Sequence, residues 1–127
     1  PDFDFADWER TYRGLLDQAR QANPALKIVL CTPFAAPCGK IVEGALGEYY
    51  PLRQRILAQC CVIVERIAAD YGATLVPFHR LIADLETRLP NGDATYWVWD
   101  GIHPTPAGQR LMADCWIGAA ARNGVME

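Results

Sequence analysis

The 127 residues contain no serine at all. A serine nucleophile with a histidine base therefore cannot be assembled from this stretch of chain alone. Long apolar runs are missing as well, since the longest candidate, "KIVLCTPFAAP" (27–37), carries a lysine and two prolines and falls short of the roughly 18 residues that suggest a membrane span. We therefore expect no membrane span.

Basic clusters and paired cysteine motifs are also absent. Twelve Lys and Arg against 15 Asp and Glu give a net charge of −3 without a basic run, which argues against nucleic acid as a partner. The five cysteines, at positions 31, 38, 60, 61 and 115, form no metal-binding pair. Reduced, buried thiols are the expectation, and they favour a cytoplasmic location. Whether a signal peptide precedes Pro1 stays open.

The periodicity of apolar residues predicts alternating helices and strands within one globular domain. Helices are predicted over about 7–22, from Leu52 to a stop at Gly72, over 79–89 and over about 106–122. Two short apolar runs, 27–32 and 73–78, predict strands buried on both faces of a parallel sheet. Residues 34–50, with three glycines, are predicted to form a long loop, and "PNGD" (90–93) a turn.

This order of elements is typical of an open α/β sheet with a right-handed crossover between its strands. Two strands are too few for such a sheet, because both edges and the outer helix faces would stay uncovered. The chain is therefore expected to be the C-terminal part of a larger domain. If it occurs alone, its exposed sheet edge predicts association, and a homo-oligomer stays open.

The segment "WDGIHPTPAG" (99–108) carries the most specific chemical signal. An aspartate three residues before a histidine, here Asp100 and His103, can accept the Nδ1 hydrogen and leave Nε2 free as a base. Thr105 is a natural helix N-cap followed by a proline at the first helical position, so the histidine precedes a rigid helix start. A bare Asp-x-x-His is also compatible with a simple turn and cap.

Four sequence segments together resemble the SGNH hydrolases, also called GDSL esterases and lipases. "DGIHPTPAGQRLMADCW" (100–116) is similar to the family's C-terminal block, and this block is the specific part. "KIVLCTP" (27–33) and "ATLVPF" (73–78) look like its last two strands, and "DFADWERTYRGLLDQARQANP" (4–24) like the helix before them. The resemblance implies a three-layer α/β/α sandwich with a parallel, flavodoxin-like sheet, of which residues 1–127 form the C-terminal portion.

The resemblance also implies an activity and two site residues. Asp100 and His103 correspond to the acid and base of a catalytic triad that hydrolyses small-molecule acyl or acetyl esters without metal or cofactor. The family's nucleophilic serine, oxyanion glycine and asparagine belong to blocks that are not recognisable here, so we expect them in a missing N-terminal half. This chain alone is then expected to be inactive. Acetylated sugars, lysophospholipids, thioesters and short-chain esters remain open as substrates.

Two other chemistries are compatible with the residue types. Cys31 ends a predicted strand and offers a thiol nucleophile for the same acid and base. A zinc site built from Asp100, His103 and His79 is a further alternative, although His79 opens a predicted helix and is typical of a cap or packing residue.

Aromatic residues near the motif and in the long loop are candidates for a substrate pocket. They are Trp97, Trp99, Phe34 and Tyr49 or Tyr50. The competing class of function is a non-catalytic, flavodoxin-like binding or interaction module whose Asp-x-x-His is only a turn.

Overall fold

A computed structural model describes residues 2–88 and 93–126 and contains the predicted alternation of helices and strands. Its main elements are α1 (Phe5–Ala22), β1 (Val29–Cys31), α3 (Tyr50–Tyr71), β2 (Thr74–Val76), α4 (Phe78–Arg88) and α5 (Pro106–Arg122). Two short elements, the 3-10 helix η1 (Gly39–Val42) and α2 (Gly44–Glu48), connect β1 to α3.

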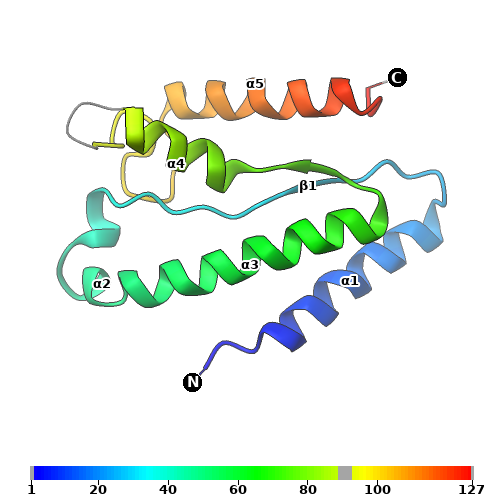
Figure 1. Cartoon of the computed structure of the whole chain (residues 1–127), viewed down its shortest axis with the longest axis horizontal. Coiled ribbons are helices and arrows are strands. Elements are labelled where there is room, and N and C mark those ends of the chain that lie inside the picture. Colours follow the sequence, from blue (N-terminus) through cyan, green and yellow to red (C-terminus); the bar gives the residue numbers. More distant parts are fainter. Residues whose placement is uncertain (1, 89–92, 127) are drawn as a thin grey trace.

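The two strands form a parallel pair with helices on both faces. Leu30 of β1 lies opposite Leu75 of β2. Both leucines belong to a core shared with α3 and α1, in which Ile63 and Ile67 of α3 are almost fully buried. Figure 1 shows the strands between these two helices and α5, which packs against β2 from the other side. This arrangement is the predicted layering of helices around a parallel sheet.

Side-chain caps decide where the first and last helices begin. The carboxylate of Asp4 accepts the N–H of Asp7 at 2.9 Å, so α1 begins at Phe5 and not near residue 7 as predicted. The hydroxyl of Thr105 accepts the N–H of Gly108 at 3.1 Å, and α5 spans the predicted 106–122. The proline-and-cap signal was therefore sufficient for α5.

The structure corrects several other predicted boundaries. Residues 34–50 are not one irregular loop, because they contain η1 and α2. Both strands have three residues instead of six, and only Leu30, Thr74 and Val76 are buried in them, so the predicted burial of both faces is incomplete. The third predicted helix runs over 78–88, and residues 89–92, with most of the predicted "PNGD" turn, lie outside the described residues.

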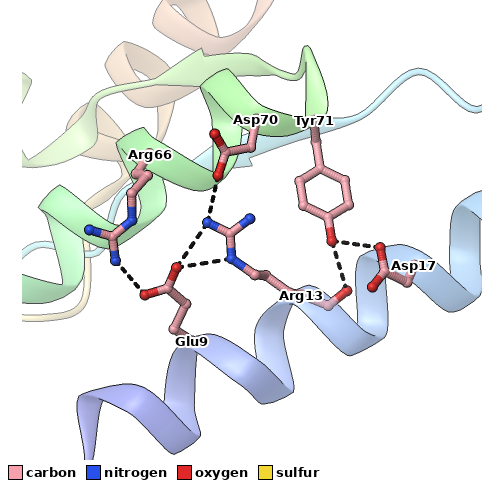
Figure 2. A network of polar contacts seen from close by, with 6 residues as sticks. All are labelled: Glu9, Arg13, Asp17, Arg66, Asp70 and Tyr71. Atoms are coloured by element: carbon pink, nitrogen blue, oxygen red, sulfur yellow. Dashed lines mark hydrogen bonds and ion pairs between the residues drawn. The ribbon is translucent and has the colours of Figure 1, made fainter.

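Helix α1 has no fully buried residue and is held to α3 partly by a polar network (Figure 2). The Arg13 guanidinium contacts the carboxylates of Glu9, at 2.9 Å, and of Asp70 on α3, at 2.6 Å. Arg66 of α3 also pairs with Glu9, and the two guanidiniums, Arg66 first, lower the pKa of the Glu9 carboxyl. Arg13 is thus the central cation between the two helices.

Replacing Arg13 with alanine is expected to lower the free energy of unfolding by about 1 kcal/mol, because two carboxylates lose a shared partner. The loss should shrink at high ionic strength, since salt screens half-exposed ion pairs. Urea unfolding at low and high salt measures both effects. Arg10→Ala is the matched control, because Arg10 pairs with Asp7 on the exposed side of α1 and contacts no carboxylate of α3 among the described residues. Equal losses for the two variants at low salt would contradict a clamping role for Arg13.

Candidate active site

Asp100 organises the turn that precedes α5. Its Oδ1 accepts the backbone N–H groups of Ile102, at 3.1 Å, and of His103, at 2.8 Å, while its Oδ2 lies 2.6 Å from Nδ1 of His103. The carboxylate therefore shapes the backbone with one oxygen and orients the imidazole with the other. The Asp-x-x-His spacing produces this geometry within a single turn.

The environment of the pair fixes where its protons lie. Hydrogen bonds from the His103 side chain and backbone lower the pKa of Asp100 to about 2, so this carboxyl is ionised at neutral pH and only accepts hydrogen bonds. The Nδ1 atom of His103 must then carry the hydrogen between them, and in the neutral ring Nε2 keeps its lone pair. The His103 side chain is 65% exposed and that of Asp100 19%, so the imidazole faces solvent while the carboxylate is sheltered.

The segment after β1 is hydrogen-bonded to this turn across 60 or more residues of sequence. The N–H of Ala36 donates to the carbonyl of Gly101 at 2.9 Å. The buried thiol of Cys38 donates to the carbonyl of Val98 at 2.8 Å. The two bonds connect residues that follow the carboxyl end of β1 with backbone carbonyls on either side of Asp100. The acid is thereby placed beyond the carboxyl end of a parallel strand, where open α/β folds keep their sites.

Two glycines allow this close contact. Gly39 has φ +61°, and a Cβ there would lie 2.6 Å from the Asp100 Cα. Gly101 has φ +95°, and its Cβ would overlap the Ile41 side chain and approach the Cys38 carbonyl oxygen at 2.8 Å. A side chain at either position would push the loop and the turn apart. This non-local packing was missed in the sequence, although glycine 39 in the predicted loop was its visible signal.

A second set of backbone bonds closes the turn against α5. The N–H of Trp99 donates to the His103 carbonyl at 3.2 Å, and that of Thr105 to the Trp97 carbonyl at 2.9 Å. Between them Val98 and Pro104 form an antiparallel bridge. The histidine thus sits in a small closed hairpin whose outgoing strand leads directly into the capped helix.

The aromatic candidates are divided between two places. Trp99 is 61% exposed and its ring centroid lies 6.4 Å from that of His103, so it stands beside the base. Phe34 and Tyr50 instead line a separate cavity of about 220 Å³ that includes neither Asp100 nor His103 in its wall. Trp97 packs into the core below the turn, and Tyr49 is largely exposed.

The alternative chemistries gain no support from the structure. Burial raises the pKa of Cys31, which keeps its sulfur in the weakly nucleophilic thiol form. His79 hydrogen-bonds the buried Thr32 hydroxyl through Nδ1, at 2.7 Å, which is a packing role at the start of α4. Within residues 2–88 and 93–126 no group of three His, Cys, Asp or Glu side chains is placed to hold a metal ion, so His79 does not join Asp100 and His103 in a zinc site.

The lengths and hydropathies of the described helices can be compared with those of membrane-spanning helices. Among them, none combines the length and the apolar character needed to cross a bilayer.

The chain combines an α/β fold with an Asp–His turn, and comparisons with known proteins show its family. The model of the GDSL-like Lipase/Acylhydrolase family matches residues 2–111. The chain therefore belongs to this family, as its resemblance to the SGNH hydrolases implied. A comparison with curated proteins finds no match.

A solved structure agrees with the family. The chain is similar to a protein from Parabacteroides merdae described as a GDSL-like lipase, with a TM-score of 0.74 and 28% sequence identity. The match covers 89% of this chain and 48% of the other. The chain thus spans about half the length of this neighbour.

Proposed function

We propose that this chain is the C-terminal portion of a single hydrolase domain that cleaves small-molecule acyl or acetyl esters, with Asp100 as the acid and His103 as the base of a catalytic triad. The observation that carries the proposal is the 2.6 Å contact between Asp100 Oδ2 and His103 Nδ1, which leaves Nε2 free and exposed. The family membership supports the hydrolase class. We place the serine nucleophile outside this chain, because the 127 residues contain none.

In this mechanism Nε2 of His103 removes the proton of the serine hydroxyl as the oxygen attacks the ester carbonyl. The imidazolium that forms is stabilised by the Asp100 carboxylate, which stays ionised because its pKa is about 2. His103 then returns the proton to the leaving alcohol, and the same base activates water to release the acyl group. No step requires a change in the Asp100–His103 hydrogen bond.

The test is hydrolysis of para-nitrophenyl esters of increasing acyl length by the full-length gene product and by the 127-residue chain. We expect turnover by the full-length protein and none by the chain, because only the former supplies a serine. Turnover by the chain itself would contradict an external serine and favour Cys31. An inactive full-length protein that is fully folded, across esters and thioesters, would overturn the hydrolase assignment and favour the binding module.

A further inference from the structure

A second candidate site lies in the cavity between α3, α4 and the loop after β1. Its volume is about 220 Å³, below the roughly 300–1,000 Å³ of pockets for drug-sized ligands, so its occupant is a small molecule. Pro33 and Phe34 form the loop side, Leu57 of α3 and Ile82 of α4 contribute aliphatic walls, and Glu86 of α4 supplies a carboxylate. The wall is mostly apolar; Glu86 is its acidic group, and the other polar side chains on it include Gln54 and His79, whose pKa is lowered mainly by burial.

Glu86 is half-buried and has no hydrogen bond or ion pair within the described part of the chain. The cations of its own helix are engaged elsewhere: Arg80 contacts Glu65 at 2.6 Å, and Arg88 contacts Asp84 at 3.4 Å. Burial raises the pKa of Glu86, as expected for a carboxylate that has lost water without gaining a partner. Half-buried carboxylates without a partner are costly, which makes this one a candidate for an external cation.

Aromatic and hydroxyl groups line the same cavity as the Glu86 carboxylate. The Glu86 charge acts on the nearby Tyr50 hydroxyl, whose pKa is raised mainly by burial and further by this charge. The Gln54 side-chain amide donates to the Tyr50 hydroxyl oxygen and to the Ala35 carbonyl, the latter at 3.0 Å, which fixes this side of the cavity. The rings of Tyr50 and Phe34 add two aromatic groups to the wall, and aromatic faces attract cations.

We propose that this cavity binds a small primary alkylammonium ion, with its N–H groups donating to the Glu86 carboxylate and its alkyl chain packed against Leu57 and Ile82. An ammonium group supplies the hydrogen-bond donors and the positive charge that Glu86 lacks. A short chain matches the volume and the apolar walls. The site does not depend on the hydrolase activity proposed above, because neither Asp100 nor His103 lines it.

The test compares n-butylammonium with 1-butanol, which has the same number of non-hydrogen atoms but no charge. Binding to the full-length protein is followed by NMR chemical-shift titration of the backbone amides of Phe34, Ala35 and α4. We expect butylammonium to bind at least about tenfold more tightly, the usual advantage of a hydrogen bond to a charged group. Equal affinity for the two ligands, or no saturable shift with either, would overturn the proposal.

Glu86→Gln removes the charge while keeping the shape, and it should abolish the preference for butylammonium over 1-butanol. Asp84→Asn is the control, because Asp84 is an exposed acid on the same helix that pairs with Arg88 and does not line the cavity. It should leave both affinities unchanged. Thermal unfolding checks that the Gln variant folds. A folded Glu86→Gln protein that still prefers butylammonium would show that Glu86 is not the partner.

Discussion

Replacing His103 with alanine in the full-length protein is expected to lower kcat for ester hydrolysis by about 10⁴- to 10⁶-fold, because the base that activates the serine and protonates the leaving group is lost. Thermal unfolding should hardly change, since the imidazole is 65% exposed and its ring makes one hydrogen bond within the described residues, to Asp100. Initial rates on para-nitrophenyl acetate, together with a circular dichroism melt, measure both. A folded variant with near-normal kcat would exclude His103 as the base.

The Asp100→Asn substitution tests how Asp100 orients the His103 imidazole separately from how it shapes the turn. The asparagine oxygen can still accept the N–H groups of Ile102 and His103, so the turn should persist. Its amide nitrogen, however, is a donor facing Nδ1, which favours the imidazole tautomer with the hydrogen on Nε2 and blocks the base. We expect kcat to fall by about 10⁴-fold. Asp114→Asn, an exposed acid on α5 paired with Arg110, should keep full activity.

Gly101→Ala is expected to be the most destabilising of the simple substitutions near the turn, with a loss of about 2–4 kcal/mol in the free energy of unfolding. Its φ of +95° strains any side chain, and the new methyl group overlaps Ile41 and crowds the Cys38 carbonyl. Urea unfolding gives the magnitude.

Gly14→Ala, in contrast, is expected to raise the free energy of unfolding. Gly14 lies inside α1 and a Cβ there meets nothing within 4 Å, so alanine should stabilise the helix by up to about 1 kcal/mol. If Gly101→Ala were tolerated as well as Gly14→Ala, the contact between the turn and the loop after β1 would not be tight in solution.

Local signals in the sequence were sufficient for the four long helices, apart from some of their ends, and for the turn that brings Asp100 and His103 together. Thr105 and the proline after it specify the start of α5, and the spacing of Asp100 and His103 lets one carboxylate bind both the backbone and the ring. These features depend on atoms within a few residues of each other. The start of α1 was nevertheless misplaced by two residues, because Asp2, Asp4 and Asp7 all lie near it and only the structure shows that Asp4 is the cap.

Features built by distant residues could not be predicted in this way. The helices η1 and α2 are too short to leave a periodic signal, and they lie in a segment whose glycine 39 packs against Asp100 from far along the chain. That Glu86 has no partner among the described residues depends on where Arg80 and Arg88 point, which the spacing along α4 does not decide. The partners of Arg13 likewise depend on how α1 crosses α3.

The hydrogen bonds from Ala36 and Cys38 to the turn have a consequence for how members of such a family diverge. The geometry of the short motif from Asp100 to His103 is not set by the motif alone, since Ala36 and Cys38, from another part of the chain, hydrogen-bond to the turn. Substitutions confined to residues 36–41 can therefore change the relative orientation of Asp100 and His103 while the motif itself stays identical. Two relatives with the same Asp-x-x-His motif need not orient the imidazole equally well. The residues responsible for such a difference would lie in the segment that corresponds to 36–41 of this chain.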